Sequence, residues 1–200
     1  DLRMSRGLGD VYKRQGVYIG WGISIYKRVI QKSVRNVLIF IAELIIFWFV
    51  VRTTKYFFTI DNQIARYLWY SYYIPMLFIP VAVLQAAFFL GKSEEYRLPK
   101  WLKGVYIPTA VLVLLVLSND LHQLVFSFPV GSAWSDSHYT YGWGYYVVLV
   151  WEVVCALTAF VLMIYKCRHS QKKKYLPLLG IGAAVLYAVL FISGVAWIQE

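Results

Sequence analysis

The 200-residue sequence contains only two cysteines, Cys155 and Cys167, so no disulfide framework is implied. No Cys or His residues show the spacing of a metal site. The sequence also lacks a phosphate-binding Gly-rich loop, a nucleophile–base pair and an Asp-rich metal motif. We therefore expect no enzyme activity, catalytic residue, cofactor or metal ion within the residues present.

Acidic residues are scarce as well: 10 Asp and Glu stand against 20 Lys and Arg, which gives a formal net charge of +10. An excess of this size can indicate nucleic-acid binding. Here, however, the basic residues stand at the ends of apolar runs and not on one soluble face. We therefore expect no nucleic-acid partner.

Apolar residues are abundant: they make up 60% of the chain, and its mean hydropathy is +0.58. They fall in runs of about 20 residues, the length that crosses a bilayer as a helix. The sequence thus predicts an all-α integral membrane protein, an antiparallel bundle of about six transmembrane helices in a lipid bilayer. The predicted spans are 16–26 (partial), 36–57, 66–90, 105–127, 143–165 and 175–197.

Residues 1–15, DLRMSRGLGDVYKRQ, differ from the rest, since they have mixed charge and no hydrophobic periodicity. They look like translated sequencing-adapter sequence fused to a truncated gene, and a short disordered basic tail is the alternative. On the first interpretation the natural N-terminus is missing. Residues 16–200 form the predicted membrane domain.

The distribution of Lys and Arg predicts the orientation of the bundle. The loops at 26–35, 91–104 and 166–174 hold four, four and five basic residues, whereas the opposite side holds three. Because basic loops stay in the cytoplasm, these three loops are predicted to be cytoplasmic. The loop at 129–142, which has no Lys or Arg, is predicted to be extracellular.

Four segments carry a resemblance to a known family: YKRVIQKSVRN (26–36), YLWYSYYIPMLFIP (67–80), SNDLHQLVF (118–126) and YTYGWGYY (139–146). With the predicted topology, they resemble the seven-transmembrane N-terminal sensor region of bacterial histidine kinases. The resemblance implies a multi-pass protein of the bacterial inner (plasma) membrane and a truncated seven-helix bundle. The seventh helix, the phosphoacceptor helix and the ATP-binding domain are absent, which we attribute to truncation. The full-length parent is expected to be a histidine kinase and to form a homodimer.

Ionisable and amide groups inside an apolar span usually face a bundle interior or a water-filled cavity. Asn119, Asp120 and His122 are such groups at the predicted outer end of the fourth span. Asn119 and His122 share a helix face at i and i+3, whereas Asp120 does not share it. We interpret Asn119 and His122 as lining an outward-facing pocket, with Asp120 orienting a neighbouring helix or, through water, His122. The alternative is that all three merely mark the helix end.

Glu152 in the fifth span is predicted to lie at the depth of His122, so it is the fourth ligand-sensing candidate. A contact between the two would favour a charged imidazole and a response to pH. The alternative, which we favour, is an uncharged carboxyl group hydrogen-bonded inside the bundle.

Two further groups of residues are candidates for other roles. Pro75 and Pro80 lie within the third span and are candidate hinges, because each proline removes a backbone donor and tends to kink a helix. Aromatic side chains at the span ends are expected in the membrane interface, although they could also surround a ligand. They are Trp69, Tyr70, Tyr72, Tyr73, Trp134 and Trp143.

These observations favour a membrane-embedded sensor or receptor domain of a bacterial signal-transduction histidine kinase. An unknown small ligand or membrane cue would act near the outer ends of the fourth and fifth spans and shift the helix packing. The signal would then reach a missing cytoplasmic output domain. The alternatives are a small-solute transporter or channel subunit, which inverted internal repeats would indicate, and a ligand-free membrane scaffold.

Overall fold

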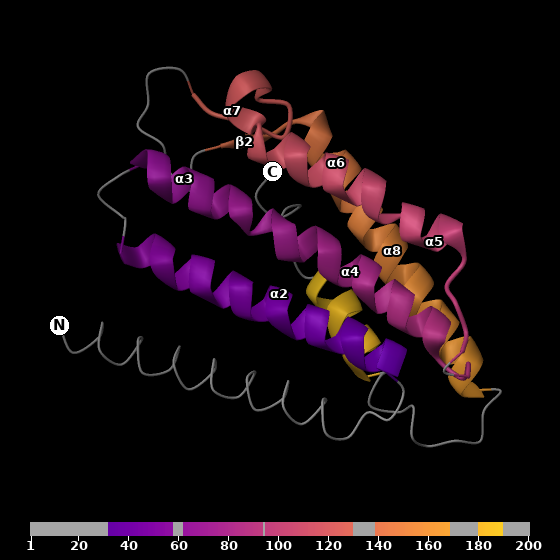
Figure 1. Ribbon diagram of the computed structural model, residues 1–200. Coiled ribbons are helices and arrows are strands. Elements are labelled where there is room, and N and C mark those ends of the chain that lie inside the picture. Colours follow the sequence, from indigo (N-terminus) through magenta and orange to yellow (C-terminus); the bar gives the residue numbers. More distant parts are fainter. Residues whose placement is uncertain (1–31, 58–61, 94, 130–138, 169–179, 190–200) are drawn as a thin grey trace.

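The computed structural model describes residues 32–57, 62–93, 95–129, 139–168 and 180–189, and these residues are mostly helical (Figure 1). The predicted all-α membrane class is confirmed, since four described helical segments are long and apolar enough to cross a membrane: Lys32–Lys55, Gln63–Phe89, Lys100–Leu117 and Trp143–Arg168. They lie over the second to fifth predicted spans. The first predicted span, 16–26, lies outside the described residues. Within the sixth, 175–197, Gly180–Val189 is an apolar helix.

The first two membrane-length segments lie side by side. Helix α2 (Lys32–Phe57) runs along α3 (Asn62–Ser71) and α4 (Tyr73–Phe89), which continue one another in nearly the same direction (Figure 1). Helix α4 also packs against α6 (Tyr106–Leu117) and α8 (Trp143–Arg168), and its contact with α8 is the most extensive. Helix α4 is therefore the central element of the described bundle.

Two of the membrane-length segments are interrupted three residues before a proline. The break between α3 and α4 falls at Tyr72, before Pro75, and the break between α5 (Lys100–Gly104) and α6 falls at Val105, before Pro108. A proline cannot donate to the carbonyl four residues earlier, and its ring crowds that carbonyl. At Pro80 no such break occurs, and α4 continues through it.

Buried apolar side chains form two clusters along the bundle. One joins α2, the second half of α4 and the second half of α8, with Ile41, Ala82 and Met163 among its members. The other joins α3, α4, α6 and the first half of α8, and includes Tyr70, Val116 and Val148. Because α4 and α8 contribute to both clusters, they connect the two halves of the bundle.

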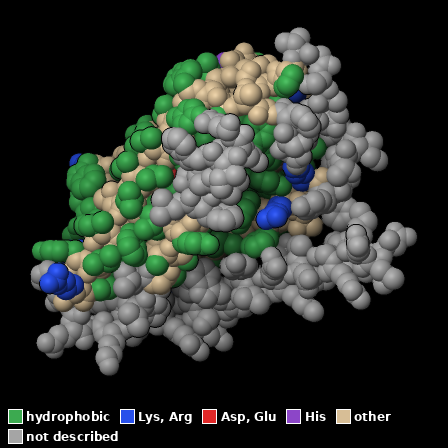
Figure 2. Space-filling model, turned by 180° about the vertical axis from the view of Figure 1, so that it is seen from behind, with side chains coloured by type: hydrophobic (Ala, Val, Ile, Leu, Met, Phe, Trp, Pro, Cys, Tyr) green, Lys and Arg blue, Asp and Glu red, His purple; other side chains and the backbone are tan. Residues whose placement is uncertain are grey.

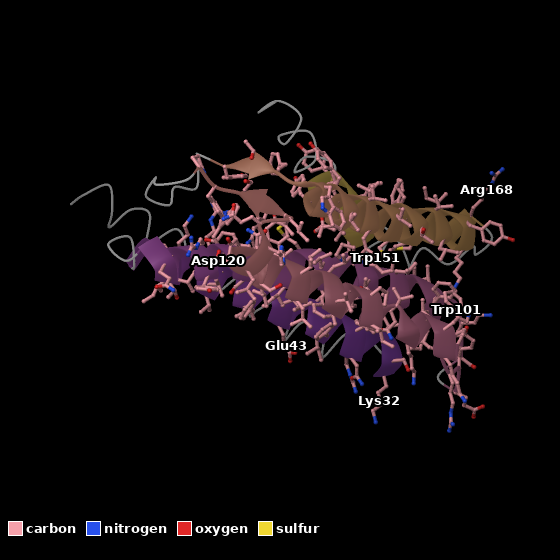
Figure 3. The ribbon with its side chains drawn as sticks, turned by 90° about the horizontal axis from the view of Figure 1, so that it is seen from above. Lys32, Glu43, Trp101, Asp120, Trp151 and Arg168 are labelled. Atoms are coloured by element: carbon pink, nitrogen blue, oxygen red, sulfur yellow. The ribbon has the colours of Figure 1, made fainter. Side chains whose placement is uncertain are left out.

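The two ends of the bundle differ in chemistry. In Figure 3, Asp120 lies toward one end, and Lys32, Trp101 and Arg168 lie toward the other. We call these the Asp120 end and the basic end. Between them, apolar side chains cover much of the described surface visible in Figure 2. Such a surface is expected of helices that face lipid.

Candidate functional site

The chain reverses direction at the Asp120 end in a compact turn. After α6 comes a single helical turn, α7 (Asn119–His122), and Gln123 then adopts a left-handed backbone conformation with φ of 50°. Its N–H donates to the carbonyl of Asn119 at 2.7 Å, which closes the helix end. The fourth predicted span, 105–127, is thus too long: Phe126–Ser127 form strand β1, paired with β2 (Thr140–Tyr141).

Asn119 is completely buried and crosslinks this turn. Its Oδ1 accepts hydrogen bonds from the backbone N–H groups of Val125 and Phe126, both at 3.0 Å. Its Nδ2 donates to the carbonyl of Phe126 at 2.8 Å and to the hydroxyl of Tyr70 at 3.2 Å. An Asn amide makes about four hydrogen bonds, so the whole capacity of this side chain is used within the protein.

Asp120 points toward a different helix. Its Oδ1 accepts a hydrogen bond from the Tyr70 hydroxyl at 2.8 Å, and its Oδ2 lies 2.9 Å from an Nη atom of Arg66. Both partners belong to α3, so Asp120 connects the turn to a neighbouring helix. The side chains of Arg66 and Asp120 are 25% and 18% exposed, and this ion pair therefore reaches water.

His122 is engaged by its own segment. The N–H of Leu124 donates to Nδ1 at 3.0 Å, so Nδ1 carries no proton. The other nitrogen, Nε2, lies 3.1 Å from the hydroxyl of Ser118, which itself donates to the carbonyl of Leu114. With Nδ1 as the acceptor from Leu124, Nε2 is the ring nitrogen that can donate to the Ser118 hydroxyl. Both nitrogens thus have partners in their own segment, and the contact between His122 and Glu152 that the sequence left open is not observed.

Phe126 is the centre of an aromatic cluster at the same end. Its ring is completely buried, and the centroid of the Trp69 ring lies 4.6 Å from its own. Five tyrosine rings lie within 6.3 Å of it by the same measure: Tyr70, Tyr73, Tyr139, Tyr141 and Tyr145. These residues come from α3, α4, α8 and the hairpin, so the cluster joins all four.

Two glycines allow α8 to begin close to the turn. A Cβ atom on Gly142 would lie only 2.1 Å from the carbonyl oxygen of Leu124, and one on Gly144 would lie 3.0 Å from the same atom. The N–H of Gly144 donates to that carbonyl at 2.9 Å, and the N–H of Gly142 donates to the carbonyl of Val125. The start of α8 is thereby fixed to the segment that Asn119 holds.

Glu152 lies on the buried face of α8 and is only 2% exposed. Its Oε1 atom is buried and makes no hydrogen bond in the described structure. The hydrogen-bonded carboxyl group that we favoured from the sequence is thus not observed at this oxygen. Nearby polar side chains instead join the helices to one another: Tyr106 donates to Gln85, and Trp151 donates to Thr109.

At the basic end, Lys166 of α8 closes the last turn of α4. Its Nζ donates to the carbonyls of Ala87 and Phe88, at 2.9 and 2.8 Å. The last carbonyls of a helix have no partner within it, and a cation there also interacts favourably with the helix dipole. Helices α4 and α8 are therefore joined at the basic end by a charged hydrogen bond.

The remaining predicted residues have varied positions. Pro75 and Pro80 are both buried in α4, and only Pro75 follows a helix break. Tyr70 and Tyr73 are buried in the aromatic cluster, Trp69 and Tyr72 are half-buried, and Trp143 is 61% exposed. Trp134 lies outside the described residues. Among the described residues, no three His, Cys, Asp or Glu side chains gather in a way that could hold a metal ion.

Arg66 and Phe126 also belong to the site, although neither was a candidate from the sequence. Arg66 is placed by α3, where it lies one helical turn before Tyr70, and both side chains reach Asp120. This i, i+4 spacing at the start of an apolar span was a usable signal. For Phe126 the sequence holds no comparable signal, because only the turn at Gln123 brings this residue back against α3 and α4.

Membrane-length helices around a polar and aromatic cluster at one end define a polytopic helical membrane protein. The family described as the N-terminal 7TM region of histidine kinase matches residues 16–198 of the chain. The chain therefore belongs to this family of membrane sensor regions, which are not themselves catalytic. No curated protein and no solved structure matched it.

Proposed function

We propose that this domain detects an extracellular or membrane stimulus at its Asp120 end and passes it to a cytoplasmic kinase domain of the same protein. Family membership supports the sensor role. The observation that carries the proposed site is the half-exposed ion pair between Arg66 and Asp120, which continues inward through Tyr70 to the buried Asn119. A small ligand or membrane cue that alters this pair would act on α3 and on the turn before α8 together.

The contacts of α4 and α8 supply a route from this site to the basic end. Both helices extend from the aromatic cluster to the opposite end, where Lys166 joins them. A stimulus shifts such a packing arrangement only if it binds one arrangement better than another. The ion pair at the Asp120 end is partly exposed to water and solutes, so a difference in binding can arise there.

The test uses the full reading frame of the gene, expressed in a bacterial host. Phosphohistidine formation from radiolabelled ATP is measured in membrane vesicles with and without each candidate stimulus. Asp120→Asn removes the ion pair with Arg66 while keeping an oxygen for Tyr70. We expect this variant to retain basal phosphorylation and to lose the response to the stimulus that activates the wild type.

Glu95→Gln is the matched control, because Glu95 is an exposed acid in the loop at the basic end. It makes the same change from acid to amide and is expected to leave the response intact. If Asp120→Asn responds like the wild type, the Asp120 end is not the sensing site. If no phosphohistidine forms in the wild type, the kinase assignment fails, and a scaffold or transport role has to be tested instead.

A further inference from the structure

Glu152 occupies an unusual position between the two apolar clusters. Along α8, Leu149 belongs to the cluster near the Asp120 end and Ala159 to the cluster near the basic end, and Glu152 lies between them. It is 2% exposed, and its Oε1 atom is buried without a hydrogen-bond partner. An apolar side chain would fill this place at no electrostatic cost, so the carboxyl group calls for a functional explanation.

Among the described residues, the surroundings of Glu152 contain titratable groups but no counter-charge. Tyr73 of α4 and Tyr145 and Cys155 of α8 interact electrostatically with it. Neither α6 nor the helix over 180–189 contributes a charged residue, and the acid in the middle of α2, Glu43, is exposed. No Lys, Arg or His of the described residues acts on Glu152. An ionised carboxylate in this place would be uncompensated, which is costly away from water.

Small buried residues of α4 and α8 accompany Glu152 in the interior of the bundle. Ala82, Ala86 and Ala87 of α4 and Ala156 and Ala159 of α8 are all at most 2% exposed. Small residues at a helix–helix contact in a membrane let the backbones approach closely. An ionised Glu152 would therefore gain water only if the two helices moved apart around it.

We propose that Glu152 is a proton-binding site whose protonation state controls the packing of α4 against α8. The protonated acid is compatible with burial in this contact, and a proton needs no cavity to bind there. Loss of the proton favours an arrangement in which water reaches the carboxylate, and by linkage any signal that separates the helices releases the proton. This inference deepens the proposed function, since it names a ligand, but its test needs no kinase output.

The test is infrared spectroscopy of the purified chain in lipid nanodiscs. A protonated carboxylic acid has a C=O stretching band that is distinct from the bands of a carboxylate, and ¹³C-glutamate labelling shifts it if a glutamate is the source. We expect a label-sensitive band at low pH that disappears when the pH is raised. Glu152→Gln should remove the band.

Glu43→Gln is the matched control, because Glu43 is also an acid within a membrane-length helix but is exposed and points away from the bundle (Figure 3). It should leave the band unchanged. A band that persists at every pH, that is absent at every pH, or that disappears in Glu43→Gln overturns the proposal. The titration of the isotope-labelled wild type decides the matter even if Glu152→Gln does not fold.

Hydrogen–deuterium exchange of α4 and α8 tests the link to packing. Glu152→Gln imitates the protonated acid at every pH, so comparison at equal pH cancels the chemical dependence of exchange on pH. We expect equal exchange in the wild type and Glu152→Gln at low pH, and faster exchange in the wild type once the infrared band has disappeared. Equal exchange at every pH overturns the link between proton and packing. A silent kinase with an intact titration contradicts only the proposed function.

Discussion

The side-chain amide of Asn119 holds three separate pieces of the chain together. It binds the backbone of Val125 and Phe126 and the hydroxyl of Tyr70, all from a completely buried position. Its neighbour Asp120, by contrast, is partly exposed and pairs with a cation that also reaches water. Two adjacent polar residues thus have different roles, one in holding the turn and one in presenting a charge to the surroundings.

Replacement of Asn119 by Ala should destabilise the domain strongly. The N–H groups of Val125 and Phe126 would remain buried without an acceptor, which costs about 1–3 kcal/mol for each group, so we expect a total loss of about 2–6 kcal/mol. The measurement is unfolding of the purified domain in detergent. Ser71→Ala is the control, because the Ser71 hydroxyl only donates to the Tyr67 carbonyl within α3. Equal stability of the two variants would contradict the crosslinking role of Asn119.

The importance of the Asn119–His122 segment could be predicted from the sequence, but the role of each residue could not. An apolar run that ends in amide, acid and imidazole groups marks a special helix end on elementary grounds. A continued helix would place Asn119 and His122 on one face. The left-handed Gln123 instead turns the chain, so that Asn119 points inward and His122 binds Ser118 and Leu124.

At the scale of elements, prolines and glycines decide where the helices break and where they begin. Pro75 and Pro108 each follow a helix interruption by three residues, whereas Pro80 lies in an unbroken helix. Periodicity and length located the membrane-length segments, since these depend on the local sequence alone. Pro75 and Pro80 were both candidate hinges, but the sequence did not show which of them accompanies a break, nor did it predict the short hairpin, because both depend on which carbonyls find partners elsewhere in the fold.

Gly142→Ala should disrupt the junction between the turn and α8. The new Cβ atom would lie 2.1 Å from the carbonyl oxygen of Leu124, a backbone atom that Asn119 and Gly144 help to fix. Such overpacking typically costs about 1–3 kcal/mol, and we expect a loss of this size in unfolding experiments in detergent.

Gly104→Ala is the matched control for this substitution, because a Cβ atom there would meet nothing within 4 Å. Gly104 lies at the end of α5, and alanine favours helices more than glycine does, so its stability should be unchanged or slightly higher. If the Gly142→Ala domain were as stable as the Gly104→Ala domain, the backbone of the turn would accommodate the added methyl group, and the close contact would not be required for stability.

At the scale of the whole molecule, two apolar clusters are connected through α4 and α8. The class of fold was predictable from composition, since apolar runs of this length leave few alternatives to a helical membrane bundle. The central place of α4 was not predictable, because every span is apolar and no sequence pattern states which helix is surrounded by the others. The small residues of α4 were the closest available signal of its central place.

The orientation of the bundle leads to a prediction for intact cells. Single cysteines are placed in a background with Cys155→Ala and Cys167→Ser, at Thr140 in strand β2 and at Ser93 in the loop at the basic end. Basic loops remain in the cytoplasm. We therefore expect Thr140→Cys to react with a membrane-impermeant maleimide in intact cells, and Ser93→Cys only after permeabilisation. The reverse pattern would place the Asp120 end inside the cell and remove the basis for external sensing.

The hydrogen bonds of Lys166 also affect how the basic end meets the lipid surface. Basic residues beside a membrane attract acidic headgroups by about 1 kcal/mol each. The Lys166 ammonium already donates to two carbonyls of α4 and has one N–H left, so it is a poor partner for a phosphate. Neutralising Lys166 would thus weaken the link between α4 and α8 and leave binding to anionic vesicles almost unaltered. Neutralising a neighbouring basic residue at this end would instead weaken vesicle binding and leave the link between the helices intact.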